Sequence, residues 1–208
     1  MSKFSFIALF SLCLSFFCLS CSKDEKEPGE YDNWLARNNA YVDSIANLAA
    51  QGKDNWSRSL VYYVPQGYAD ANPNDKNLYV YIQKVSAGTG TVNPLYSDSV
   101  RVHYCGRLIP SKSYPLGRVF GQSFTETTIQ DIDEKTEVPA LLAVNENVPG
   151  FCQALLGMVE GQIVRLVIPY PMGYGASSSN SSIPDNSTLI FDVKLVRVYY
   201  RGEKTDWR

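Results

Sequence analysis

The sequence lacks the side chains that most acid–base and metal enzymes gather at one place. Its 208 residues include a single histidine, and no group of cysteines and histidines has the spacing of a metal site. The formal net charge of −2 is mild, which argues against a nucleic-acid partner. The chain also has no internal repeat and no βαβ alternation. We therefore expect one folded domain that needs no metal and no cofactor, with an oligomeric state that the sequence leaves open.

Cysteine is scarce in the part of the chain that can fold. Of the five cysteines, Cys13 and Cys18 lie in an N-terminal apolar segment and Cys21 lies at its end. Cys105 and Cys152 remain. Outside the cytoplasm these two thiols can form a disulfide, but the sequence does not bring them within bonding distance. We expect two buried free thiols, with a disulfide as the alternative.

The N-terminal apolar segment has the features of an export signal. Lys3 precedes an apolar run over residues 4–19, which is long enough for a signal-peptide core and short for a membrane span. The run ends at Leu19-Ser20-Cys21, and a small residue followed by cysteine resembles a bacterial lipoprotein signal, in which the cysteine is lipidated. We therefore expect a signal peptide at residues 1–20 and a lipid anchor on Cys21, with an ordinary secretory signal as the alternative.

Residues 21–30 carry many charges and no large apolar side chain, a composition that is typical of a flexible tether. The Ser-Lys-Asp-Glu start at residues 22–25 resembles the export tag of surface lipoproteins in Bacteroidetes-type bacteria, although a plain solvated linker has the same composition. The predicted location is therefore the cell envelope, with a lipid anchor in the outer membrane and the folded part on either the periplasmic face or the cell surface.

Residues 31–98 predict an N-terminal extension that begins with a helix. Over residues 32–51 the apolar side chains recur at spacings of seven, four and three, and so share one helical face; they are Trp34, Tyr41, Ile45 and Leu48. Asp32 or Asn33 can cap the start of this helix, and Gly52 can end it. An apolar face of this kind packs either on the main domain or against a partner.

The rest of the extension is rich in β-forming residues. The runs at residues 60–64 and 78–82 predict strands, because they consist mostly of β-branched and aromatic side chains. Pro65-Gln66-Gly67 and the segment 72–75 between them predict turns.

Residues 99–200 predict the main domain. Val100, Val102 and Tyr104 alternate within residues 99–108, as in a half-buried strand. Pro149 is favourable in the first turn of a short helix over residues 149–156. Further strands are expected at residues 138–144, 163–168 and 188–199. Strands, one short helix and then strands again indicate an antiparallel α+β domain.

Five blocks of this region occur in a distinctive order. They are Val102 to Leu108; Gly117 to Ser123, with Phe120 in the middle; Val148 to Phe151, followed by Gly157-Met158; Tyr174-Gly175; and Ile183-Pro184, followed by Thr188 to Val193. In this order the blocks resemble the FKBP-type peptidyl-prolyl cis-trans isomerases. The resemblance implies the fold of that family, a curved antiparallel β-sheet wrapped around a short helix, here with the helical and β-rich extension before it.

The resemblance also implies a pocket and assigns its residues. The expected catalytic residues are Tyr104, Phe120, Tyr174 and Phe191. The expected substrate-binding residues are Val148, Phe151, Ile183, Gly121 and Gln122. Phe151 would form the floor, where the family usually has tryptophan. Since the large members of this set are apolar or phenolic, the implied pocket is suited to bind and desolvate a ligand, and it offers no nucleophile.

One position departs from the family pattern. The family commonly has aspartate directly after the phenylalanine that matches Phe120, and that carboxylate is implicated in orienting the substrate. Here the position is Gly121, followed by Gln122. Gln122 or Tyr104 would replace the carboxylate only in part, so the resemblance implies an isomerase weaker than is usual in the family.

The predicted function is thus a peptidyl-prolyl cis-trans isomerase that helps exported proteins to fold and takes proline-containing polypeptides as clients. Two alternatives remain. One is a non-catalytic FKBP-like binding module or chaperone, which the glycine at position 121 favours. The other is an interaction protein whose partner binds residues 31–98.

Two titratable residues of the predicted strands are candidates for structural roles. His103 alternates away from Tyr104, so we expect an exposed or hydrogen-bonded strand residue and not a catalytic base. Asp192 follows Phe191 in the last strand, and we expect it to form a hydrogen bond or an ion pair.

Overall fold

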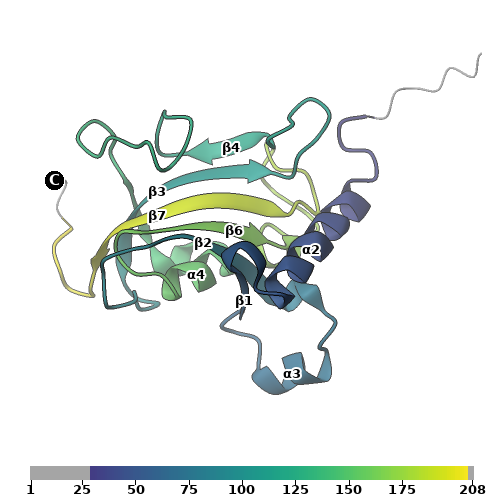
Figure 1. Cartoon of the computed structure of the whole chain (residues 1–208), viewed down its shortest axis with the longest axis horizontal. Helices are drawn as coiled ribbons and strands as arrows, with labels where there is room; N and C mark the ends of the chain where they lie inside the picture. The colour runs from purple at the N-terminus through teal and green to yellow at the C-terminus, as the bar shows by residue number, and fades with distance from the viewer. Residues whose placement is uncertain (1–28, 206–208) are drawn as a thin grey trace, which may run out of the picture.

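An antiparallel sheet of seven strands forms the frame of the protein, in a computed structural model that describes residues 29–205 (Figure 1). The strands lie in the order β1-β2-β6-β7-β3-β4, and β5 also pairs with β3. Their bounds are β1 Trp56–Leu60, β2 Tyr79–Ala87, β3 Ser99–Leu108, β4 Val119–Gln122, β5 Ala140–Ala143, β6 Gln162–Ile168 and β7 Leu189–Tyr199. The α+β class expected from the order of elements is confirmed.

Within residues 29–205, three α-helices lie around this sheet; Figure 1 shows their arrangement. They are α2 Trp34–Ala50, α3 Gln66–Ala71 and α4 Pro149–Leu156. Short 3₁₀ turns are η1 Lys53–Asn55, η2 Lys76–Leu78, η3 Val144–Glu146 and η4 Tyr170–Met172. Among the described helices, none combines the length and the apolar character that crossing a bilayer requires. The expected signal peptide and the lipid anchor on Cys21 lie outside the described residues.

Strand β7 is the central strand on which the domain is built. It pairs with β6 on one side and with β3 along its whole length on the other. Its sequence is rich in β-branched and aromatic residues, which suit a strand covered on both faces. Opposite Gly106 of β3 lies Phe191, and opposite Tyr104 lies Val193. This register fixes which side chains of the two strands share a face.

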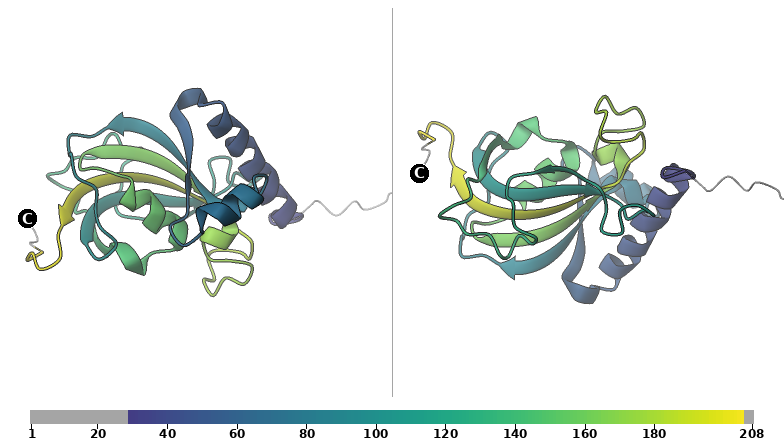
Figure 2. Two further views of the ribbon diagram at one scale, coloured as in Figure 1. Left: turned by 90° about the horizontal axis from the view of Figure 1, so that it is seen from below. Right: turned by 90° about the horizontal axis from the view of Figure 1, so that it is seen from above.

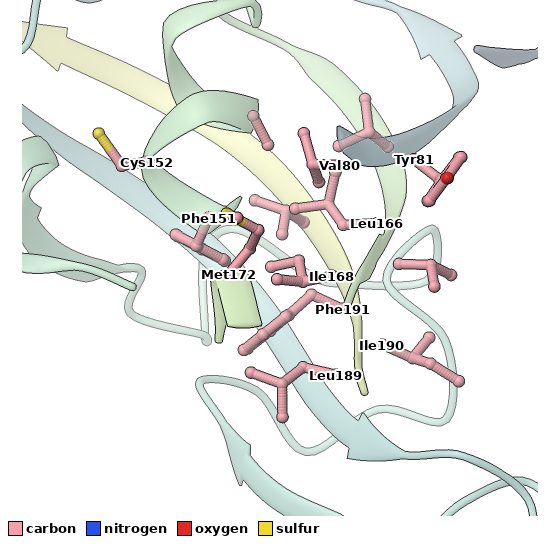
Figure 3. Close-up of a cluster of buried hydrophobic side chains, with 14 of the residues drawn as sticks. Val80, Tyr81, Phe151, Cys152, Leu166, Ile168, Met172, Leu189, Ile190 and Phe191 are labelled. Carbon is pink, nitrogen blue, oxygen red and sulfur yellow. The ribbon is translucent and has the colours of Figure 1, made fainter. Parts of the chain in front are cut away.

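Helix α4 packs its apolar side against the concave face of the sheet. Pro149 stands in its first turn, where the missing N–H costs no hydrogen bond, and Gly157 follows its last residue. Phe151, from α4, and Phe191, from β7, lie together in the core (Figure 3). The helix has the bounds that the sequence predicts.

The predicted division of the chain at residue 98 does not correspond to a structural boundary. Strand β2 pairs with β6, with Tyr81 opposite Val167 and Ile82 opposite Leu166, so the segment before residue 98 contributes two strands to the common sheet. Val80 and Tyr81 are completely buried. The apolar runs of this segment therefore complete the core, and only α2 and α3 are additions to the sheet.

The predicted strand at residues 60–64 is misplaced. The strand that forms is β1, Trp56–Leu60, and the chain leaves the sheet at Val61. Val61 is nevertheless completely buried, and its N–H donates to the Leu78 carbonyl, so an apolar run there does not require a strand. Beyond it, the residues predicted as a turn begin the short helix α3.

Helix α2 crosses one end of the sheet, beside the strand ends (Figure 2). Its buried side chains are Trp34, Asn38, Val42, Ile45 and Ala46. Trp34 and Ile45 of the predicted stripe are thus buried, whereas Tyr41 and Leu48 are half-buried at its edges. The N-cap is Asn33, in a left-handed conformation, and no side chain caps the helix. The predicted start of the helix at Asn33 is confirmed, but the predicted capping bond from its side chain is absent. Of the two alternatives for the apolar face, the structure shows packing on the main domain.

A second, smaller apolar cluster contains Cys105, Phe124, Ile129 and Ile132. Cys105 and Cys152 are both free and buried, as the sequence predicts. Burial raises the pKa of each thiol, which keeps it protonated and unreactive. Asp192 accepts hydrogen bonds from Arg107 and Arg165 at 2.7 Å each, which confirms the expected ion pair.

His103 differs from its predicted environment. The side chain is completely buried, and neither ring nitrogen has a hydrogen-bond partner in the described part of the chain. Its ring lies edge-on to Phe124 of the smaller cluster. Burial lowers the pKa of His103, so the imidazole is neutral in the folded protein at neutral pH.

Candidate functional site

A cavity of about 310 Å³ opens between the concave face of the sheet, the start of α4 and the loop that precedes β7. The residues that line it are Tyr104, Phe120, Gly121, Leu142, Glu146, Asn147, Val148, Phe151, Tyr174, Asn180 and Phe191. Seven of the nine residues that the sequence assigns to the pocket are therefore brought together at one place, from β3, β4, α4, β7 and the loop.

Phe191 is at the centre of an aromatic cluster within this cavity. Its ring centroid lies 5.0 Å from that of Phe151, 5.4 Å from that of Phe120 and 6.4 Å from that of Tyr104. The contacts with Phe151 and Phe120 are edge-to-face, an arrangement that aromatic quadrupoles favour. Phe191 is held on three sides, so the apolar floor is rigid before any ligand arrives.

Strand β4 delivers two consecutive residues to the cavity because it contains a β-bulge. Gly121 pairs with Gly106, whereas Val119 pairs with Arg107, so Phe120 is the extra residue. A bulge of this kind breaks the alternation of side chains. Phe120 and Gly121 thus both reach the cavity, although a regular strand would turn one of them away.

Gln122 is not part of the cavity, contrary to the prediction from sequence. It pairs with Cys105, one position beyond Gly121, and alternation turns its exposed side chain to the opposite face of the sheet. Ile183 is also misplaced by the prediction. It is only 2 % exposed and belongs to the apolar core, so it supports the loop without lining the cavity.

Gly106 keeps the aromatic cluster open. A β-carbon at this position would lie 2.6 Å from Phe191 Cε1 and 2.7 Å from two ring atoms of Phe120. Real β-carbons do not approach other atoms so closely, so any other residue would displace one of the rings. Gly106 is thus required for the shape of the cavity.

Gly121 leaves open space in the wall of the cavity. A β-carbon there would lie 3.7 Å from Tyr104 Cε2 and 3.8 Å from Tyr104 Oη, which are ordinary van der Waals distances. An aspartate would therefore fit, with its carboxylate beside the Tyr104 hydroxyl. The wall of the cavity therefore has room for the carboxylate that the family commonly has here, and the carboxylate is missing only because position 121 is glycine.

The rim of the cavity is polar, and the sequence did not predict all of it. Glu146 and Asn180 also line the cavity. Glu146 could have been predicted from the sequence, because it directly precedes Asn147 and the pocket residue Val148. The Asn147 amide donates to the Ala143 carbonyl at 2.7 Å, so it holds η3 together. Tyr174 is 40 % exposed on the loop. Its hydroxyl has no hydrogen-bond partner among residues 29–205, which leaves it available to a ligand.

The chemistry open to this site is binding and desolvation. Its described lining contains one carboxylate and two phenols, and no histidine, cysteine or serine. His103, Cys105 and Asp192 alternate with cavity residues along their strands, so they lie on the other face. In residues 29–205 no group of acidic, cysteine and histidine side chains can hold a metal ion. Nothing in this lining attacks a substrate.

The sequence model of the family described as FKBP-type peptidyl-prolyl cis-trans isomerase matches residues 90–196, which is half of the chain. The chain belongs to this family. The match includes the strands, the helix and the loop that form the cavity, whereas α2 and strands β1 and β2 precede it. The FKBP fold expected from sequence is confirmed.

Curated relatives are similar to this chain over part of their length. The 22 kDa FKBP-type peptidyl-prolyl cis-trans isomerase of Escherichia coli is 31% identical over 138 residues, which cover 66% of this chain and 59% of that protein. The macrophage infectivity potentiator of Trypanosoma cruzi is 32% identical over 121 residues, which cover 58% of this chain and 54% of that protein. The chain thus spans a little over half the length of these relatives.

A solved structure shows the same fold. The crystal structure of a peptidyl-prolyl cis-trans isomerase from Pseudomonas syringae pv. tomato matches 82% of this chain and 97% of that chain, with a TM-score of 0.54 and 22% sequence identity. Because the match extends beyond the family region, the N-terminal part of this chain has counterparts in that structure as well.

Proposed function

We propose that this protein is a peptidyl-prolyl cis-trans isomerase that acts on proline-containing segments of exported polypeptides. The observation that supports this most directly is the aromatic cavity, in which Phe191 contacts Phe151 and Phe120 and forms a rigid apolar floor. Such a floor fits the flat faces of a proline ring and excludes water from them.

Isomerisation of a prolyl bond requires no covalent chemistry. The partial double bond of the amide sets a barrier of about 18–20 kcal/mol. In the twisted transition state the amide loses resonance and becomes less polar. A site that replaces water by apolar walls therefore binds the twisted amide better than the planar one. Each tenfold gain in rate requires about 1.4 kcal/mol of such preference.

Different residues of the cavity contact different parts of the substrate. Phe151 and Phe191 support the proline ring, and the Tyr104 and Phe120 rings close its sides. The unbonded hydroxyl of Tyr174 donates to a carbonyl of the substrate next to the proline. Gly121 offers no group that orients the rotating carbonyl, so the rate is lower than in a site with aspartate there.

A second candidate function is a binding module that holds proline-containing chains without isomerising them. Gly121 favours this candidate, because it removes the polar group of the cavity wall and leaves the apolar floor intact. The two candidates differ in one measurable property. Both bind proline peptides, and only the isomerase increases the rate of cis-to-trans conversion.

We also propose that the protein works in the cell envelope, anchored by a lipid on Cys21 in the outer membrane. The apolar segment at residues 4–19 and the Ser20-Cys21 pair support this location. Metabolic labelling with a radioactive fatty acid tests the anchor. The wild-type protein should be labelled, Cys21→Ala should not, and equal labelling of both would refute the anchor.

The proposed activity is tested with a chromogenic tetrapeptide that has leucine before proline. We expect the full chain to increase the cis-to-trans rate, and Phe120→Leu to lower kcat/KM by about tenfold, because the edge-to-face contact with Phe191 is lost. Val119→Ala is the matched control, since Val119 is the preceding residue of β4 and does not line the cavity. No rate above buffer with several peptides, combined with measurable binding, would support the second candidate.

A further inference from the structure

Helix α2 lies outside the residues that match the family, yet it is bonded to the segment that leads into β7. Two of its buried side chains, Trp34 and Asn38, make these bonds. Figure 2 shows the helix at the end of the sheet where this segment enters. The loop that supplies Tyr174 and Asn180 to the cavity ends at the same place.

Asn38 is completely buried, and both ends of its amide are used. Its Oδ1 accepts the backbone N–H of Thr188 at 2.7 Å, and its Nδ2 donates to the Trp34 carbonyl at 2.7 Å. Thr188 is itself buried, so without Asn38 its N–H would lack a partner away from water. A buried amide satisfied in this way has one fixed orientation and fixes the backbone that it contacts.

Trp34 makes a second attachment one residue earlier. Its indole N–H donates to Ser187 Oγ at 2.8 Å, and the same hydroxyl donates to the Pro184 carbonyl at 2.6 Å. A chain of hydrogen bonds thus runs from the helix into the C-terminal part of the loop. The residues that are held in this way, Pro184, Ser187 and Thr188, do not themselves line the cavity.

The loop transmits this attachment to the cavity. The Asn186 N–H donates to the Gly175 carbonyl at 3.1 Å, which joins the end of the loop to the residue after Tyr174. Within the loop, Ser178 N–H donates to Asp185 at 2.8 Å. Arg118, the residue before β4, donates to the Ser182 carbonyl and holds the loop from that side. These bonds connect the residues that α2 holds, Ser187 and Thr188, with the segment next to Tyr174.

We propose that Trp34 and Asn38 are positioning residues for the site, which hold the loop bearing Tyr174 and Asn180 against the cavity. The inference rests on the proposed function, because it concerns affinity for the same proline-containing ligand. Helix α2 thus does more than pack on the sheet, because it determines how closely the loop covers the bound proline-containing polypeptide.

Four variants of the full chain separate positioning from stability. Asn38→Leu and Trp34→Phe remove the hydrogen bonds to Thr188 and Ser187 and keep most of the side-chain volume. Val42→Ala is the matched control, because Val42 is buried on the same helix and makes no hydrogen bond to the loop. Asn38→Asp is the conservative variant, since it keeps an acceptor for the Thr188 N–H.

We expect two results from Asn38→Leu and Trp34→Phe. Hydrogen exchange of amides 176–186 accelerates, and KM for the proline tetrapeptide rises about fivefold while kcat changes little, as the loss of one hydrogen bond implies. Val42→Ala lowers the melting temperature and leaves both quantities unchanged. Asn38→Asp restores part of the loop protection that Asn38→Leu loses.

Equal loop exchange and equal KM in wild type and in both variants would overturn the inference, whatever their melting temperatures. So would a Val42→Ala variant that shows the same rise in KM. If the wild type does not accelerate isomerisation, the proposed function fails. The inference is then decided by loop exchange and by the dissociation constant of the same peptide, measured by NMR titration.

Discussion

The wall of the cavity beside Tyr104 is where a single residue has most influence on the chemistry. A β-carbon on Gly121 would contact the Tyr104 ring at ordinary van der Waals distance, so the backbone already accepts a side chain there. The aromatic floor formed by Phe191 and Phe151 does not depend on position 121. Affinity for the proline ring and the orientation of its amide are thus supplied by different residues.

Gly121→Asp is therefore expected to increase activity. The added carboxylate can accept a charge-assisted hydrogen bond from the Tyr104 hydroxyl, which fixes that side chain beside the rotating amide, and a bond of this kind corresponds to roughly a tenfold rise in kcat/KM. The measurement is the initial cis-to-trans rate with the chromogenic tetrapeptide. Gln122→Asp is the matched control, because it adds the same charge on the opposite face of β4. A rise of equal size in both variants would show that the charge acts at long range and not in the cavity.

Strands β3, β4 and β7 create the site by their mutual register. Gly106 faces Phe191 on one side and Gly121 on the other, and the bulge in β4 places Phe120 and Gly121 together. The cavity is consequently a property of three strands that are distant in sequence. A change at their point of closest approach should disturb all of them.

Gly106→Ala is expected to damage both fold and binding, because its β-carbon would lie within 2.7 Å of the Phe191 and Phe120 rings. Overpacking of this kind costs about 1–3 kcal/mol of unfolding free energy. Urea unfolding followed by tryptophan fluorescence measures the loss. Gly157→Ala is the control, since a β-carbon there meets its nearest atom at 3.6 Å. A Gly106→Ala variant as stable as the control would contradict the close approach of the strands.

The sequence predicts those elements whose signals are local. Helix α4 has the expected bounds because Pro149 and Gly157 mark its ends without help from the rest of the chain. The bulge at Phe120 depends on pairing with β3, so the sequence alone did not reveal that Gln122 faces outward. The family resemblance places Ile183 at the cavity, and only the folded loop shows that this side chain is buried in the core.

At the scale of the whole molecule, the two faces of the sheet have separate tasks. The concave face bears α4 and the cavity, and the other face bears the small cluster around Cys105 and the ion pairs of Asp192. Strands β1 and β2 extend the sheet beyond β6, although the sequence predicts that they belong to a separate extension. His103, Cys105 and Asp192 lie on this other face, so we expect changes in their charge to affect the stability of the fold and to leave the cavity unchanged.

His103 is expected to make global stability depend on pH. Its pKa is lowered by burial and by Lys194, against weaker opposite effects of Glu134 and Glu137, so the unfolded chain takes up a proton below pH 6.5 before the folded protein does. Stability then falls as pH falls through that range, by at most about 1.4 kcal/mol per pH unit. Urea unfolding from pH 7.5 to pH 5 measures the slope, and His103→Leu should reduce it. The same slope in both proteins would contradict the assignment to His103.

The central claim is that the aromatic cavity binds a prolyl residue and speeds its rotation, and exchange NMR of a proline peptide tests it most directly. With the full chain present at a small fraction of the peptide concentration, the account predicts exchange cross-peaks between the cis and trans forms, and Phe120→Leu should weaken them. It also predicts that the peptide shifts the amide signals of Gly121 and Phe151. Shifted signals without exchange would leave only a binding module, and exchange without any shift at these residues would contradict the site.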